Sequence, residues 1–445
     1  MRHTLPLMTP QTLVPGSASA RRTRPLGGAP LALAAGWLAT RAGMLFLLTH
    51  SGSVLLGSGG VSREVHHLYA RWAGQLGDGT FPVGDALWQY PPGAGPVLLA
   101  PALVPWLTYF EAFVALTLLA DAIVTAALTR AGLRPGRTLG GAALWVCALP
   151  LLLHLPLARY DVQVTAFAVA GLLVAERSAR AGGVCAALGA AVKLWPALIL
   201  LGTPRGRPTR RAWTAAAVTG GLLLTLLAVA FRNPQGFLRE QGARGVQIES
   251  LGGTLLGLAR HAGWPGTVRY RYGAMEFVGP QVDTVAAVSL ALTAAAGVLL
   301  LVWRAGARRW TEATPYDAAL CAVLLFTTTS RVISPQYLVW LLGLAAVCLT
   351  SHRTSQRPVA ALVVLATAVS TVVYPLLYAE VVASSWTGCL LMLTRNGLLV
   401  TATALSARRL WRATRPPGAR RPPPPAPDAH ETPRSVPWNS RATPR

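Results

Sequence analysis

Long apolar runs recur through most of this sequence and constrain its fold more than any other feature. A run of roughly 17 to 25 apolar residues can cross a bilayer as a helix. Only 13% of the residues are charged, about half the fraction typical of soluble domains, which argues against a large water-soluble core. We therefore predict an all-α polytopic membrane protein. It has about twelve candidate spans, at about residues 30–50, 92–107, 109–130, 139–157, 162–176, 183–202, 212–231, 281–303, 317–331, 333–350, 359–379 and 386–405.

Arginine placement predicts the orientation of these spans. The net charge of +24 would suggest nucleic-acid binding in a soluble protein. Here arginines gather at both ends of the chain and in short connections, at 177–180, 205–211, 304–309 and 353–357. The positive-inside rule puts such segments in the cytoplasm. We expect a multi-pass protein of the plasma membrane with both termini cytoplasmic, and no nucleic-acid partner.

Two candidate spans leave an alternative topology open. Segment 92–107 is short and proline-rich, and segment 183–202 carries Lys193. If both were re-entrant, everything between them would change sides. The sequence Arg159-Tyr160-Asp161 would then lie on the outer face.

The remaining segments complete the predicted organisation. We expect a cytoplasmic N-terminal segment (1–29), a membrane domain (30–405) with outer loops at about 51–91 and 232–280, and a disordered cytoplasmic tail rich in proline and arginine (406–445). All five cysteines lie in apolar segments without CxxC spacing, which is typical of small core residues.

The polar loop between the first two apolar segments is the best candidate for chemistry. Three of the 16 acidic residues of the chain, Glu64, Asp78 and Asp85, fall within it. Carboxylates and aromatic side chains at a membrane surface suit chemistry on sugars or lipid head groups. The accompanying aromatic and amide side chains include His66, His67, Tyr69, Trp72, Phe81, Trp88, Gln89 and Tyr90.

Charged residues inside predicted spans need a reason, since each costs roughly 2.5 to 3.5 kcal/mol on insertion. Lys193 is the only lysine in the chain, and it could bind a phosphate or simply pair within the bundle. Arg159 and Asp161 could form an interfacial ion pair or hold a substrate group. For Asp121, pairing with a neighbouring helix is the favoured interpretation.

Polar residues also occur further along the chain, in the second outer loop and at a break between two late spans. Arg239, Glu240, Arg244, Gln247 and Glu249 could line a cleft, but a solvated face is favoured for each of them. The break places a cation beside hydrogen-bonding side chains, namely Arg331, Ser334, Gln336 and Tyr337.

Three patterns together resemble glycosyltransferase family 87, a group of polytopic enzymes with a GT-C-type fold. The first is EVHHLY at 64–69, followed by GTFPVGD at 79–85 and WQYPP at 88–92. The second is Arg159-Tyr160-Asp161, followed by GAAVKLWP at 189–196. The third is SPQYLVW at 334–340. Each is weak alone, but their order extends over about residues 30–405.

The resemblance implies a GT-C-like bundle with a catalytic first outer loop. Members are thought to take a sugar, often mannose, from a polyprenyl-phosphate carrier and add it to a lipid or glycan outside the membrane. An acid of the first outer loop acts as general base, a role that falls on Glu64 or Asp85 here. Members often have aspartate at the first position, where this chain has Glu64.

The residues fit this chemistry. Arg159, Lys193 and Arg331 are candidates to bind the donor phosphate, because cations stabilise the charge that develops on it. Direct displacement with one base implies inversion, and we expect neither a metal nor a cofactor. A transporter or flippase of a lipid-linked sugar, or a non-catalytic subunit of an envelope-synthesis complex, is the alternative. Candidate substrate-binding residues are His66, Tyr69, Gln89, Tyr90, Asp161, Gln336 and Tyr337.

Overall fold

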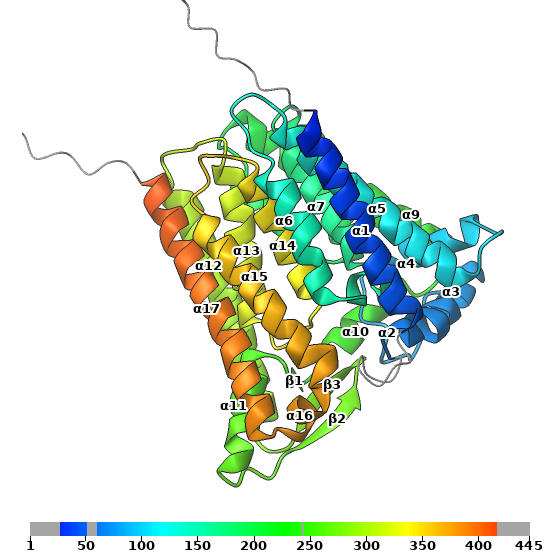
Figure 1. Cartoon of the computed structure of the whole chain (residues 1–445). Helices are drawn as coiled ribbons and strands as arrows, with labels where there is room; N and C mark the ends of the chain where they lie inside the picture. The colour runs from blue at the N-terminus through cyan, green and yellow to red at the C-terminus, as the bar shows by residue number, and fades with distance from the viewer. Residues whose placement is uncertain (1–26, 51–59, 243, 416–445) are drawn as a thin grey trace, which may run out of the picture.

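Helices form most of the structure and run side by side in one bundle (Figure 1). The computed structural model describes residues 27–50, 60–242 and 244–415. The helices are α1 (Gly28–Thr49), α2 (Gly60–Arg63), η2 (Glu64–Tyr69), α3 (Ala70–Gly77), α4 (Ala94–Leu99), η3 (Ala100–Leu103), α5 (Tyr109–Gly132), α6 (Gly140–Ala148), η4 (Leu149–Leu152), η5 (Leu155–Ala158), α7 (Asp161–Ala175), α8 (Ala179–Val192), η6 (Trp195–Gly202), α9 (Arg207–Ala230), α10 (Gly236–Gly242), α11 (Leu251–His261), α12 (Val282–Gly306), α13 (Thr314–Thr329), α14 (Tyr337–Leu349), α15 (Arg357–Thr371), η7 (Val372–Leu376), α16 (Tyr378–Ala383) and α17 (Trp386–Thr414).

Six of the described helices are long and apolar enough to cross a membrane, namely α1, α5, α9, α12, α15 with η7, and α17. Large apolar side chains are exposed on them, including Val229 of α9 and Leu290 of α12. Such surfaces suit contact with lipid. The chain is therefore a multi-pass membrane protein made largely of helices. The count of twelve crossings is not confirmed.

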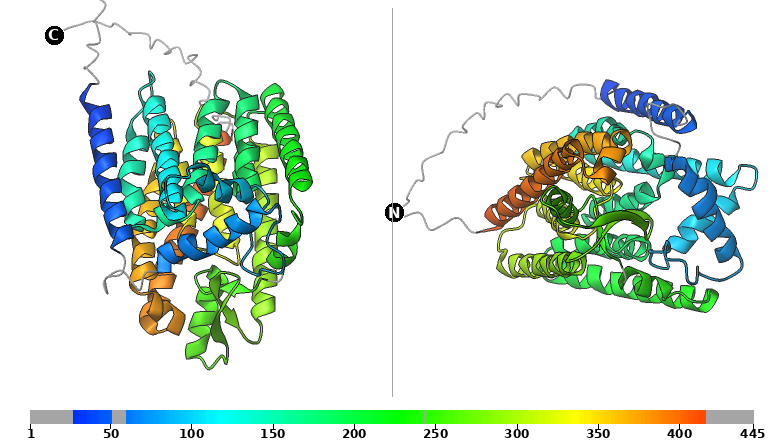
Figure 2. Two further views of the ribbon diagram at one scale, coloured as in Figure 1. Left: turned by 90° about the vertical axis from the view of Figure 1, so that its right-hand side faces the viewer. Right: turned by 90° about the horizontal axis from the view of Figure 1, so that it is seen from below.

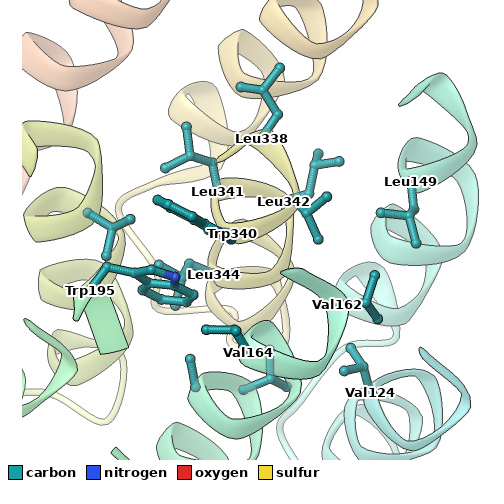
Figure 3. Close-up of a cluster of buried hydrophobic side chains, with 14 of the residues drawn as sticks. Val124, Leu149, Val162, Val164, Trp195, Leu338, Trp340, Leu341, Leu342 and Leu344 are labelled. Carbon is teal, nitrogen blue, oxygen red and sulfur yellow. The ribbon is translucent and has the colours of Figure 1, made fainter. Parts of the chain in front are cut away.

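Helix α14 forms the centre of the bundle. Its side chains are apolar on all sides and are buried from Leu338 to Cys348, as expected of a helix surrounded by other helices. Trp340 stacks on Trp195 of η6, with ring centroids 5.3 Å apart, and Val164 of α7 lies in the same cluster (Figure 3). This packing fixes α14 against the elements that carry the candidate site.

A small antiparallel sheet lies at one end of the bundle, which we call the sheet end. Its strands are β1 (Val246–Gln247), β2 (Thr267–Arg271) and β3 (Ala274–Val278), in the order β1-β3-β2. The first residue of α1 and the last of α17 lie at the opposite end (Figure 1). The sheet falls within the predicted outer loop 232–280, where the all-α prediction included no strand.

The first re-entrant candidate does not run from one end of the bundle to the other. Helices α4 and η3 together have ten residues, which reach about 15 Å, half of a bilayer core of about 30 Å. The Tyr109 hydroxyl, at the start of α5, donates to the carbonyl of Leu98 at 2.9 Å. The Phe110 ring stacks on His66 of the first loop, with centroids 4.0 Å apart. Helix α5 thus begins where the loop lies.

The second re-entrant candidate forms a helical hairpin. Helix α8 runs antiparallel to α7, so that Lys193, just after α8, forms an ion pair with Asp161, the first residue of α7 (2.6 Å). Helix η6 then runs back. Ala179, at the start of α8, and Thr203, just after η6, both line a second cavity. The segment therefore begins and ends at the same end of the bundle.

The two re-entrant segments place the Arg159-Tyr160-Asp161 sequence beside the first loop. The Arg159 guanidinium lies 2.8 Å from the Glu64 carboxylate. This arrangement fits the alternative in which both weak spans are re-entrant.

The predicted chain ends fall largely outside the described residues. Segment 1–26 and the tail from 416 onward lie outside them, as does 51–59 of the first loop. Helix α17 continues to Thr414, past the expected boundary of the membrane domain at 405.

A buried ion pair joins α1 to the rest of the bundle. The Arg41 guanidinium donates from Nε and Nη2 to the two Asp121 carboxylate oxygens, at 2.7 and 2.9 Å. The indole N–H groups of Trp37 and Trp145 donate to the same carboxylate at 2.6 and 2.7 Å. The interpretation that Asp121 pairs with a neighbouring helix is confirmed. The pair links α1, which lies at the edge of the bundle (Figure 2), to α5 and α6.

We predict that Asp121→Ala lowers the free energy of unfolding by about 3 to 5 kcal/mol, because it leaves the Arg41 charge buried without a partner. Thermal unfolding in detergent measures the effect. Ile123→Ala is the matched control, since Ile123 lies on the same helix with 51% of its side chain exposed, and it should change stability by less than about 0.5 kcal/mol. Equal unfolding temperatures for the two variants would contradict a stabilising role for the pair.

Candidate active site

A cavity of about 440 Å³ lies at the sheet end of the bundle. It is surrounded by the first loop, the segment after α8, helix α10, the β2–β3 hairpin and the chain from α13 into α14. Its polar and aromatic lining includes Glu64, Gln89, Tyr90, Lys193, Gln241, Arg244, Tyr270, Tyr272, Arg331, Ser334, Gln336, Tyr337 and Trp340.

Glu64 is the only carboxylate among the described residues that line this cavity. It is the first residue of η2, a π-helical turn, and such wide turns are frequent at functional sites. Its side chain is 31% exposed, and its Oε1 atom lies 2.8 Å from Nη2 of Arg159. The carboxylate is thus oriented by a cation yet remains open to the cavity.

Arg159 contacts the first loop but does not line the cavity. Its side chain is only 7% exposed, and Nη1 donates to the carbonyl oxygens of Val61 and Ala158 at 3.1 and 2.8 Å. Three acceptors therefore fix one guanidinium. Arg159 is thus bonded to the Glu64 carboxylate on one side and to backbone carbonyls on the other.

Asp85, the other candidate base, lies outside the cavity lining. Its carboxylate accepts hydrogen bonds from Arg71 at 2.6 Å and from the Trp72 indole at 2.9 Å. Its second oxygen accepts from the backbone N–H of Leu87 at 3.0 Å. These bonds tie the second half of the first loop to α3.

Lys193 lines the cavity, and its ammonium is paired with the buried carboxylate of Asp161. Lys193 Nζ and the Trp340 indole N–H both lie 2.6 Å from Oδ1 of Asp161, and Asp161 is only 1% exposed. The ammonium also lies 4.7 Å from the centroid of the Tyr160 ring, within the range of cation–π attraction. Lys193 faces the cavity, but its charge is balanced by a buried carboxylate.

Arg331 is different, because it forms no ion pair within the described part of the chain. Its Nη2 atom donates to the carbonyl of Gln241 at 2.6 Å. The nearby Arg244 is paired with Glu276 at 3.0 Å. Among the described cations lining the cavity, Arg331 therefore has the charge most available to an anion.

The segment around β1 holds Arg331 in place. The backbone N–H of Gln247 donates to the carbonyl of Arg331 at 3.1 Å, and its side-chain amide donates to the Ser334 hydroxyl at 3.4 Å. Two residues later, Glu249 pairs with Arg395 of α17 at 3.2 Å. Burial raises the pKa of Glu249 to about 7, although the Arg395 guanidinium acts to lower it.

The structure brings together most, but not all, of the residues singled out from the sequence. Seven line the cavity: Glu64, Gln89, Tyr90, Lys193, Arg331, Gln336 and Tyr337. Five do not: His66, Tyr69, Asp85, Arg159 and Asp161. Of these, Tyr69 is buried among aromatic rings that include Trp72 and Phe113.

Sequence reasoning missed the cavity residues of the second outer loop. Gln241, Tyr270 and Tyr272 were not singled out, and Arg244 was assigned to a solvated face. The alternation in VRYRYG at 268–273, ending in a glycine, is typical of a strand that enters a turn. That signal could have placed two tyrosines on one face.

A comparison with protein families identifies the class to which this membrane protein belongs. The model for glycosyltransferase family 87 matches residues 88–335, more than half of the chain. The chain belongs to glycosyltransferase family 87 and is a membrane glycosyltransferase. The match includes Arg159, Lys193 and Arg331, and it begins after Glu64 and Asp85. No curated protein matches the sequence.

We predict that Arg159→Ala lowers kcat for sugar transfer by at least about tenfold, with little change in KM, because Glu64 loses the cation that orients it. Arg71→Ala is the matched control, since it frees Asp85 in the same way. Its kcat should stay within about threefold of wild type. Arg159→Lys should restore part of the rate. Steady-state kinetics on folded protein, checked by its unfolding temperature, measure these effects. A larger loss in Arg71→Ala would favour Asp85 instead.

Proposed function

We propose that this enzyme transfers a hexose, mannose in the first instance, from a polyprenyl-phosphate donor to a lipid or glycan acceptor, with inversion at the anomeric carbon. The observation that carries the proposal is that one cavity contains the Glu64 carboxylate and the Arg331 guanidinium, which has no acidic partner among the described residues. A base for the acceptor and a cation for the leaving phosphate are what this reaction requires.

Glu64 is the proposed general base. In the reaction, an acceptor hydroxyl oxygen forms a bond to the anomeric carbon while its proton passes to the Glu64 carboxylate. The bond from the anomeric carbon to the phosphate oxygen breaks, and the polyprenyl phosphate leaves with the electron pair. Asp85 is less suited to this role, because its oxygens already accept from Arg71, Trp72 and the Leu87 backbone.

Arg331 is the proposed main contact of the donor phosphate. Lys193 and Arg244 add positive potential, but each is already paired with a carboxylate, Asp161 and Glu276 respectively. A phosphate that gains charge as the bond breaks is stabilised most by the cation that is not already neutralised.

A lipid-linked donor is supported by the apolar edge of the cavity. Leu194, Leu238 and Leu290 line it and are each more than 60% exposed. Leu290 lies on α12, one of the six helices long enough to cross a membrane. A polyprenyl chain could therefore stay in lipid while its sugar phosphate enters the cavity.

Inversion is supported by the carboxylate count. Retention through a glycosyl–enzyme intermediate normally needs two carboxylates, one of them a nucleophile. Glu64 is the only one in the described cavity lining. We place the reaction on the external face of the plasma membrane, because the arginine-rich connections lie away from the cavity and the positive-inside rule puts them in the cytoplasm. Nucleotide sugars are absent outside the cell, which also favours a lipid-linked donor.

We predict that Glu64→Gln lowers transfer by about 10²- to 10⁴-fold, the usual contribution of a general base. The assay uses purified protein in liposomes with radiolabelled polyprenyl-phosphate mannose and membrane lipid acceptors. Asp85→Asn, the matched control, should lose less than about tenfold, because asparagine still accepts from Trp72. Transfer that survives Glu64→Gln but not Asp85→Asn would reverse the assignment.

We predict that Arg331→Ala raises KM for the donor by about ten- to a hundredfold, the loss expected for a hydrogen-bonded charge on a phosphate. Arg239→Ala is the control, since Arg239 lies on α10 with its side chain 76% exposed and outside the cavity. An unchanged donor KM in Arg331→Ala would sink the phosphate assignment.

A further inference from the structure

The β2–β3 hairpin contributes two tyrosines to the wall of the Glu64 cavity. Arg271 and Ala274 are paired across the strands, so only Tyr272 and Gly273 form the turn. Tyr270 lies in β2, two residues before Tyr272 in the turn. Both tyrosines line the cavity, while Arg269, on the alternate face, does not.

The turn itself does not explain why a tyrosine stands at its first position. Tyr272 has φ +51° and Gly273 has φ +77°, the two positive values of a type I′ turn. Asparagine, aspartate or glycine is strongly preferred at the first position, and a bulky residue there is strained. Strain of this kind tends to occur where the side chain has a function.

Both tyrosine rings are free to receive a ligand. Within the described chain, neither Tyr270 nor Tyr272 stacks on another ring or forms a side-chain hydrogen bond, and Tyr270 is 57% exposed. One exposed and one half-buried aromatic ring on the wall of a cavity are suited to a ligand ring that is apolar on its faces and polar at its edge. A pyranose has that character, since its C–H groups form the faces and its hydroxyls the rim.

Both tyrosines line the same cavity as the Glu64 carboxylate. The apolar edge, with Leu238 and Leu290, is the side assigned above to the donor lipid. Burial raises the pKa of Tyr270, the negative charge of Glu64 raises it further, and the Arg159 guanidinium acts to lower it. A sugar ring held by the hairpin would therefore lie in the cavity that contains Glu64.

We propose that Tyr270 and Tyr272 form the subsite that holds a sugar ring of the acceptor, so that the hydroxyl receiving the hexose belongs to a carbohydrate. This inference rests on the proposed function and adds to it the chemical class of the acceptor and the residues that select it.

A binding experiment tests the subsite without depending on the donor. Full-length protein in nanodiscs is mixed with octyl α-D-mannopyranoside, octyl β-D-glucopyranoside or octyl β-D-galactopyranoside, and saturation-transfer NMR reports which ligand protons touch the protein. We expect saturation of ring protons for at least one sugar. Affinity should fall by at least about tenfold in the double variant Tyr270→Ala/Tyr272→Asn. No ring saturation by any of the three, or unchanged affinity in the double variant, would overturn the proposal.

Two substitutions separate recognition from stability. Tyr272→Asn places a preferred residue in the turn, so the unfolding temperature should hold or rise while sugar binding weakens. Tyr270→Phe keeps the ring and should retain binding. Arg269→Ala, on the other face of β2, is the control and should bind as wild type does. Equal weakening by Arg269→Ala would show that the hairpin acts only as a scaffold.

Transfer assays keep this inference distinct from the proposed function. In the double variant, KM for the acceptor should rise while binding of polyprenyl phosphate stays unchanged. Sugar binding that is intact in a wild-type protein unable to use any polyprenyl-phosphate hexose would contradict the proposed donor but support the subsite. Transfer to a product whose new bond joins the hexose directly to a lipid alcohol would contradict the subsite.

Discussion

The ion pair between Lys193 and Asp161 is the contact on which the site depends. A carboxylate with 1% of its side chain exposed needs a cation partner, and the only lysine of the chain supplies it. The pair joins the start of α7 to the end of α8, and Trp340 bonds the same oxygen from α14. Close backbone packing supports it, since a Cβ on Gly93 would lie 2.6 Å from the Ala191 carbonyl. Helices α7 and α8 are thereby joined to α14, which is distant in sequence, beside one cavity.

Much of the bundle could be predicted from the sequence, because the length and polarity of apolar runs report directly on helices in lipid. Every predicted span overlaps an observed helix. The length of an apolar run does not show whether its helix crosses the bilayer or turns back within it. Segment 183–202 is as apolar as a crossing helix, yet its chain reverses around Lys193 because that ammonium is held by Asp161 at the start of α7. The short strands were missed for a related reason, since they lie in a loop where no long hydrophobic pattern guides prediction.

For the site, the sequence located the right segments but could not assign partners. Glu64 and Asp85 look alike in the sequence, as two acids in one polar loop. Their neighbours in space distinguish them, because Arg159 comes from beyond α6 to orient Glu64, while Arg71 and Trp72 occupy Asp85. The same holds for the cations, where only the fold reveals that Arg331 lacks an acidic partner among the described residues. Pairing over long sequence separations is a tertiary property that local patterns do not contain.

The two re-entrant segments, 92–107 and 183–202, each begin and end at the same end of the bundle. This arrangement also affects how the chain is inserted into the membrane during synthesis. Had segment 183–202 crossed the bilayer, the arginines at 177–180 and at 205–211 would stand on opposite sides, and retention of positive charge in the cytoplasm would oppose translocation of the first group. As a hairpin, the segment leaves both groups on one side, together with the arginines at 304–309 and 353–357. The second reversal contributes Lys193, Leu194 and Trp195 to the cavity lining, and neither reversal changes the number of complete crossings. Loop elements of this kind can be lengthened or shortened while the orientation of every later helix is preserved.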